Sequence, residues 1–194
     1  MPLSDVQFSR FAEMEVAKVL TFLSRGLLEC MLPMTDDERR DIETHLKEHF
    51  RLSLAIQVKA AHVLYGHLRV PRFQKSFMVK AERLIADPFF FYFFGYMDLK
   101  TMAFRTPVFF VPSEVVHRDA VHRRKGDLLY YNLVASMDPR SHDRWRAYAC
   151  DPAELADRIV RFLREQARAT RITQGANLAS VLADPGTLFV TRAA

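Results

Sequence analysis

Side chains suited to divalent-metal chemistry occur at three places in the first third of the sequence. Asp41 precedes one candidate strand, and Gln57 and Lys59 are two residues apart in the next candidate strand. Glu13 and Glu15 occur in an amphipathic stretch before them. A metal-dependent phosphodiesterase needs carboxylate or carbonyl oxygens for the cation and a lysine near the attacked phosphate. These residue types make a metal-assisted hydrolytic site the first hypothesis.

The glutamates must be positioned by a helix. Apolar residues recur at helical spacing over 8–28, and Gly26 stands close to the end of that stretch. At about 100° per residue, Glu13 lies about 60° and Glu15 about 100° from Val16, the centre of the apolar stripe. Glu13 is therefore the better candidate, and Glu15 is expected to pair with Lys18.

Alternation of apolar and polar residues predicts a strand over 52–60. Side chains alternate with period 2, so Gln57 and Lys59 share one face of this strand. The other face is apolar, with Leu54, Ile56 and Val58. The glutamine oxygen can replace a carboxylate as a neutral metal ligand.

Two interpretations of 36–50 remain open. Thr35 and Glu38 form a capping box before good helix formers, which favours a helix and would make the chain a helical regulator. Alternatively, 41–46 is a strand headed by Asp41, followed by a turn near Glu48. The strand would carry its alternate residues Ile42, Thr44 and Leu46 on one face. Asp36 and Asp37 compete with Asp41 as the acid.

The order of these residues resembles the PD-(D/E)xK nuclease superfamily, in the restriction-endonuclease-like branch whose second acid is glutamine. The resemblance covers roughly 8–113 and implies an α/β fold with a mixed central sheet flanked by helices. It implies that Asp41, Gln57 and Glu13 hold Mg²⁺ or Mn²⁺, and that Lys59 orients the water that attacks DNA. A homodimer is a further implication. Segments 94–98, 107–113 and 141–145 also resemble bacterial proteins of this general kind, which implies no activity.

Further elements are expected along the chain: a helix over 72–85, strands over 89–97, 106–111 and 128–134, a polar loop over 138–144 pinned by Trp145, and a helix over 153–169. The 89–97 strand is apolar on both faces, so we place it at the centre of the sheet. The central sheet is expected to combine 41–46, 52–60, 89–97 and 106–111. The helices over 8–28 and 153–169 flank it.

Length and composition limit the protein class. The chain has 194 residues, a net charge of +5 and two cysteines. We expect one domain over 1–170 and an arm or extra strand over 171–194. The longest apolar run is far shorter than the roughly 20 residues of a membrane-spanning helix, so no membrane span is expected. The sequence shows no disulfide pattern and no secretory signal, which predicts a reducing cytoplasm.

The remaining charged side chains have ordinary interpretations. The run 123–125 is expected to be a solvated turn, although it could also contact phosphates, and His117, His122 and His142 are expected to be surface histidines. Arginines recur at 158, 161, 164, 168 and 171, as on a solvated helix face, although such a stripe also suits a nucleic-acid backbone. The alternative function is a non-catalytic nucleic-acid-binding or protein-interaction domain that keeps the fold without efficient metal binding. Glutamine at position 57 favours that alternative.

Overall fold

The computed structural model describes residues 3–34, 39–66 and 70–169. Its centre is a mixed sheet, here called sheet A, with the strand order β1-β2-β3-β5-β7-β10. Its strands are β1 (Leu28–Met31), β2 (Ile42–Leu46), β3 (Ser53–Ala61), β5 (Phe90–Asp98), β7 (Val108–Pro112) and β10 (Ala149–Cys150), with β6 (Ala103–Phe104) paired to β5. Only the β3–β5 pairing among these is parallel. The predicted α/β fold with a mixed central sheet flanked by helices is confirmed.

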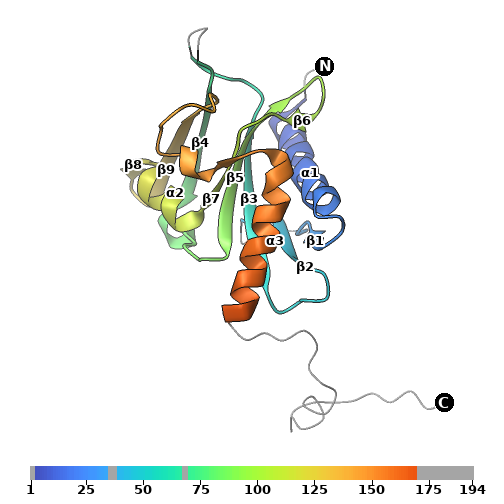
Figure 1. The fold of residues 1–194 in the computed structure, drawn as a ribbon. Coiled ribbons are helices and arrows are strands. Elements are labelled where there is room, and N and C mark those ends of the chain that lie inside the picture. The colour runs from blue at the N-terminus through green and yellow to red at the C-terminus, as the bar shows by residue number, and fades with distance from the viewer. Residues whose placement is uncertain (1–2, 35–38, 67–69, 170–194) are drawn as a thin grey trace, which may run out of the picture.

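A second sheet, here called sheet B, packs against one face of sheet A (Figure 1). It is antiparallel, in the order β4-β9-β8. The strands are β4 (Arg72–Lys80), β8 (Val121–Lys125) and β9 (Leu128–Ser136). Helix α2 (Ser113–Asp119) lies in the same layer. Helices α1 (Asp5–Leu23) and α3 (Pro152–Ala169) cover the opposite face of sheet A.

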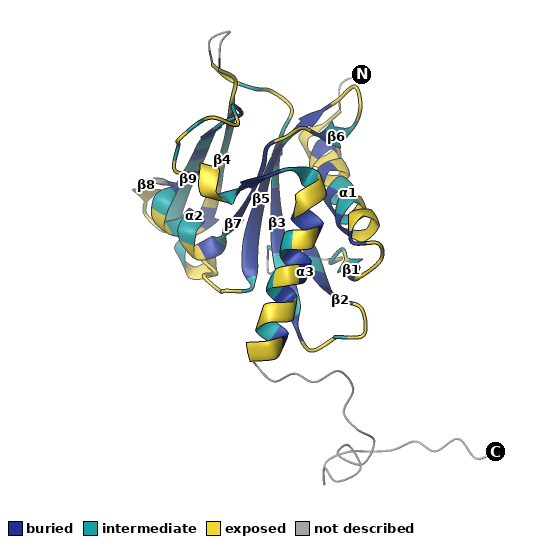
Figure 2. Ribbon diagram, viewed as in Figure 1, coloured by how far each residue is buried: buried dark blue, intermediate teal, exposed yellow. Residues whose placement is uncertain are grey.

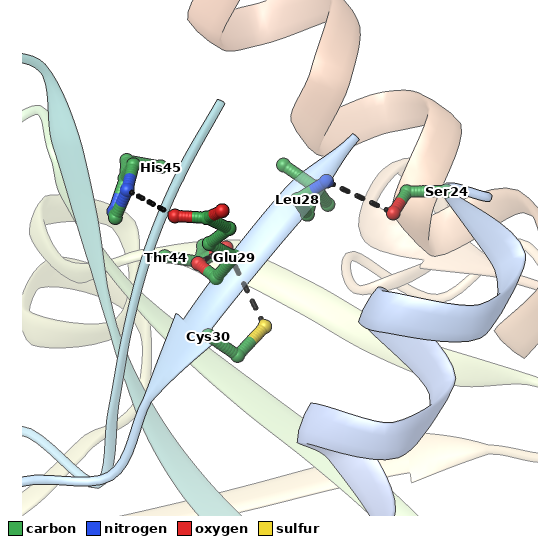
Figure 3. Close-up of polar contacts among 6 residues, drawn as sticks. All are labelled: Ser24, Leu28, Glu29, Cys30, Thr44 and His45. Atoms are coloured by element: carbon green, nitrogen blue, oxygen red, sulfur yellow. Dashed lines mark hydrogen bonds and ion pairs between the residues drawn. The ribbon is translucent and has the colours of Figure 1, made fainter. Parts of the chain in front are cut away.

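Helix α1 begins at a capping box in which Ser4 and Gln7 satisfy each other's backbone N–H groups. It ends at Leu23, earlier than the predicted 8–28 span, and Gly26 adopts φ +74° just beyond it. The residues after this turn form β1, which the helical periodicity did not indicate. Figure 3 shows how β1 is held: the Leu28 N–H donates to Ser24 Oγ at 3.0 Å.

The same close-up shows two contacts between β1 and β2 (Figure 3). Glu29 Oε2 lies 3.2 Å from His45 Nε2 on one face, and Cys30 Sγ donates to Thr44 Oγ1 at 3.5 Å on the other. The threonine hydroxyl in turn donates to the Glu29 carbonyl. These contacts fix the register of an edge strand that is only four residues long.

The strand interpretation of 41–46 is confirmed by β2, and the helix interpretation of 36–50 is wrong for 42–46. Ile42 and Leu46 pack into the core beneath α1 and α3, and Thr44 is buried on the same face. Glu48 makes the predicted turn with φ +69°. The capping box at 35–38 lies outside the described residues.

Strand β5 occupies the centre of sheet A, between β3 and β7, as predicted. Phe91 and Phe93 pack against the α1 and α3 side, and Tyr92 and Phe94 pack against the sheet B side. Figure 2 shows this two-sided burial in the central strands, whereas the outer sides of α1 and α3 are exposed. A strand covered on both faces needs apolar residues at every position, which explains the aromatic run.

Two sequence predictions for the sheet B region are wrong. The expected helix over 72–85 is instead β4, because Phe73, Phe77 and Val79 alternate toward sheet A and the whole strand pairs with β9. The basic run expected as a turn at 123–125 belongs to β8. Strands β7 and β9 and helix α3 confirm the predictions at 106–111, 128–134 and 153–169.

The polar loop before β10 is pinned by Trp145, as expected, since its side chain is only 3% exposed. Asp143 holds this loop by accepting bonds from the backbone N–H groups of Ser136 and Trp145. Short 3-10 turns at Ala81–Arg83 and Arg146–Tyr148 complete the described elements. The predicted arm over 171–194 lies outside the described residues. No helix in the described ranges is long and apolar enough to cross a membrane.

Candidate functional site

Asp41 lies immediately before β2 and is fixed against β3 by two hydrogen bonds. Its Oδ2 accepts from the Val58 N–H at 2.6 Å, and its own N–H donates to the Ile56 carbonyl at 3.0 Å. Asp41 precedes the first residue of β2 and lines a pocket with residues of α1. The head of β2 therefore presents a carboxylate beside the middle of β3.

Gln57 is buried near the middle of β3. Its neighbours Ile56 and Val58 pack toward α1 and α3, so Gln57 faces sheet B. The residue is 5% exposed, and its Oε1 atom has no hydrogen-bond partner within the described part of the chain. A buried carbonyl oxygen without a partner is costly, and such an atom commonly marks a place for a water or a cation.

Lys59 shares that face, two residues along β3, as predicted. Its Nζ lies 5.6 Å from the centroid of the Phe77 ring on β4, so the ammonium lies between the two sheets. The ring face is electron-rich and attracts the cation. Sheet B thus contributes an aromatic side chain, Phe77, to the site. The sequence analysis had placed this residue in a helix.

Glu13 approaches Asp41 from helix α1. Both residues line a surface pocket of about 400 Å³, together with Ser9, Arg10 and Arg40, but Gln57 and Lys59 do not line it. Glu13 Oε2 accepts from Arg10 at 2.9 Å. The structure therefore places Glu13 and Asp41 in one pocket and bonds Asp41 to the backbone of β3. Gln57 and Lys59, on that strand, lie outside this pocket.

The other acids weighed from the sequence are placed differently. Glu15 forms its predicted ion pair with Lys18 on α1. Asp36 and Asp37 lie outside the described residues.

A buried Tyr–His pair next to Gln57 was not predicted. Tyr92 stands in register with Gln57 on the adjacent strand, and its hydroxyl is hydrogen-bonded to His117 Nε2 at 3.0 Å. Burial raises the pKa of Tyr92 strongly; the negative charge of Asp41 adds to this and the Arg39 guanidinium opposes it. The tyrosine is therefore neutral and within electrostatic range of the candidate site.

The expectation of a surface His117 is wrong. Burial lowers the pKa of His117 from 6.5 to about 4, so the imidazole is neutral at pH 7. Its Nδ1 atom is buried without a partner among the described residues. The sequence carried no signal for this pair, since Tyr92 is one aromatic in an apolar run and the register of β3 and β5 is a tertiary property.

The donor types at the site suit a hard divalent cation only in part. Carboxylate and amide oxygens are ligands for Mg²⁺, and Asp41, which accepts from the Val58 N–H, and the unpartnered Gln57 Oε1 are of these types. Over residues 3–34, 39–66 and 70–169, no group of three His, Cys, Asp or Glu side chains could hold a metal ion. Any cation here would depend on the glutamine oxygen and on water.

Comparison with known proteins gives a likeness in structure but no match in sequence. No family model matches the sequence, and no curated protein matches it. Among solved structures, the bacterial homing endonuclease I-Ssp6803I is similar over 88% of this chain and 99% of that chain, with 14% identity and a TM-score of 0.47. At this level the likeness assigns neither fold nor activity to this chain.

Proposed function

We propose that the protein hydrolyses phosphodiester bonds of DNA with the help of Mg²⁺ or Mn²⁺. The observation that carries the proposal is the buried Gln57 Oε1, which lacks a partner beside the Asp41 carboxylate and two residues before Lys59 on one strand face. An acid, a neutral oxygen and a lysine together are the groups that metal-assisted phosphoryl chemistry uses.

Each residue has a separate role in this proposal. Asp41 and Gln57 would hold the cation, and Glu13 would complete the shell of the metal or its water from α1. When bound, the cation would polarise the phosphate and lower the pKa of a bound water. Lys59 orients the attacking water and offsets the charge that develops on the phosphate.

The test is the nicking of supercoiled plasmid with Mg²⁺ or Mn²⁺. Lys59→Ala and Asp41→Asn are each expected to lower the nicking rate by about 100-fold or more, the usual loss when a group that stabilises transition-state charge is removed. Lys47→Ala and Asp157→Asn change the same residue types at exposed positions and are the matched controls. Equal nicking by the wild type and both site variants would refute the proposal.

A second candidate function is a nucleic-acid-binding or protein-interaction domain that keeps the fold without efficient metal binding. Two observations favour it: the second ligand position is an amide, and Glu13 is already bonded to Arg10. Calorimetry with Mg²⁺ and Mn²⁺ separates the two functions. Heat of binding that is lost in Asp41→Asn supports the nuclease, and an absence of heat and of thermal shift supports the binding domain.

Self-association stays a prediction, which sedimentation equilibrium tests.

A further inference from the structure

The basic charge of the protein is concentrated in sheet B. Its three strands contain six of the 28 lysines and arginines and none of the 23 acids. The rest of the chain is therefore close to neutral. The acids near sheet B lie outside its strands: Glu82 is 3.9 Å from Lys80, Asp127 is in the β8–β9 turn, Asp143 accepts from the Ser136 N–H, and the charge of Asp5 acts on Lys75. A polyanion would meet little repulsion on this sheet.

The side of sheet B that faces away from sheet A is polar and basic. Phe73, Val79, Tyr131 and Leu133 point into the core between the sheets, so the alternate residues point outward. The outward side chains are Arg72, Gln74, Ser76, Met78 and Lys80 on β4, Arg123 and Lys125 on β8, and Leu128, Tyr130, Asn132, Val134 and Ser136 on β9. All are exposed or partly exposed.

Contacts across the strands preorganise this outer face. The Arg123 guanidinium lies 4.8 Å from the centroid of the Tyr130 ring, which holds the cation over the sheet. Asn132 Oδ1 accepts from Ser76 Oγ at 3.1 Å and from Gln74 Nε2 at 3.3 Å. These two bonds do not use the Asn132 amide nitrogen, and amide side chains of this kind can bond to base edges.

The dimensions and position of the face suit a DNA duplex. Strands β4 and β9 have nine residues each, which at about 3.3 Å per residue gives roughly 30 Å, close to one turn of B-DNA. Antiparallel strands of this type fit the major groove. Arg39 Nη1 donates to the Met78 carbonyl at 3.1 Å, which joins the segment before Asp41 to β4, whereas Phe77 and Lys59 meet on the inner side of sheet B.

The arginine stripe on α3 is a weaker candidate for the same role. Glu154, Asp157 and Glu165 are interleaved with its arginines, and Arg158 donates to the Ala149 carbonyl and lies 3.6 Å from Glu154. The electrostatic potential over that helix therefore has regions of both signs. Sheet B has no acid between its cations.

We propose that the outer face of sheet B binds double-stranded DNA in its major groove, with the cations on phosphates and the Gln74, Tyr130 and Asn132 side chains toward the bases. This rests on the proposed function in taking DNA as the substrate. Bound there, the duplex would run along β4, the strand to whose Met78 carbonyl Arg39 donates.

The test is binding of a labelled duplex of about three helical turns in EDTA, where no cleavage occurs. The perturbation is Arg123→Gln together with Lys125→Gln. A plot of the logarithm of the binding constant against the logarithm of the salt concentration has a slope of about −0.9 for each phosphate contact. Loss of two contacts is therefore expected to make this slope shallower by about 1.8. Affinity near 0.15 M salt should fall about 30-fold. Arg161→Gln with Arg164→Gln on α3 is the matched control and should bind like the wild type.

Two further probes address other polyanions. A duplex of RNA should bind more weakly, because its deep major groove does not admit a sheet, and anionic lipid vesicles should not respond to the Arg123 and Lys125 changes. Unchanged DNA affinity in the sheet B variant, an equal loss in the α3 variant, or equal RNA affinity would each overturn the proposal. Binding in EDTA does not depend on the metal, so failure of this surface and failure of the catalytic site are measured separately.

Discussion

The pH dependence of stability is expected to depend on His117. Burial lowers its pKa from 6.5 to about 4 in the folded protein, so the folded state favours the neutral ring. The resulting stabilisation is fully present above pH 6.5. It is lost as the pH falls from 6.5 toward 4, because the unfolded chain takes up the proton first.

The size of this effect follows from the pKa difference. A difference of about 2.5 corresponds to about 3.4 kcal/mol at 1.36 kcal/mol per pKa unit. Part of the ring is exposed to solvent, which screens the penalty, so about 2–3 kcal/mol is expected. The hydrogen bond between His117 Nε2 and the Tyr92 hydroxyl defines the replacement, because a glutamine side chain can bond to the same hydroxyl without titrating.

The assay is urea unfolding of the wild type and His117→Gln between pH 4 and 7. Carboxylates lose stability in the lower part of this range in both proteins, so the difference between the two curves isolates the histidine. The wild type should lose about 2–3 kcal/mol more than the variant. His142→Gln, at an exposed histidine, should follow the wild type. Parallel curves for the wild type and His117→Gln would refute the argument from burial.

Three further predictions concern packing, a loop and the thiols. Gly95→Ala should lower the free energy of unfolding by about 1–3 kcal/mol in urea titration, because the new Cβ would lie 2.7 Å from Phe104 Cδ1; unchanged stability would mean that the ring moves freely. Asp143→Ala should cost about 1–3 kcal/mol and increase the tryptophan's exposure to a fluorescence quencher, because two backbone N–H groups lose their acceptor; wild-type quenching would contradict this. Burial raises the pKa of Cys30 and, to about 11, that of Cys150, so both should alkylate slowly at pH 7.5, and rapid labelling of the native protein would contradict this.

The candidate site was predictable in residue type but not in arrangement. Alternation placed Gln57 and Lys59 on one face of β3, and the structure agrees. Whether Asp41 headed a strand could not be decided, because the capping signal and the alternating pattern of 41–46 compete at similar strength. Pairing of β2 with β3, a contact between different segments, decides it.

Sheet B shows why local patterns failed elsewhere. The sequence of β4 contains good helix formers among apolar residues spaced two and four apart, so 72–85 suited a helix as well as a strand. Its nine pairings with β9 exist only in the folded chain. Pairing with β9 likewise made β8 a strand rather than a turn, and it placed Arg123 and Lys125 on one face.

By itself, the sequence determined the central apolar strand, the two flanking helices and the alternation that aligns Gln57 with Lys59. These are consequences of hydrophobic periodicity, which acts over a few residues. Only the tertiary structure decided that Asp41 lies against β3, that the buried Tyr92 pairs with a half-buried His117 beside Gln57, and that the cations of two strands share one surface. Those are contacts between residues far apart in the chain, and they depend on strand order and register, which periodicity does not contain.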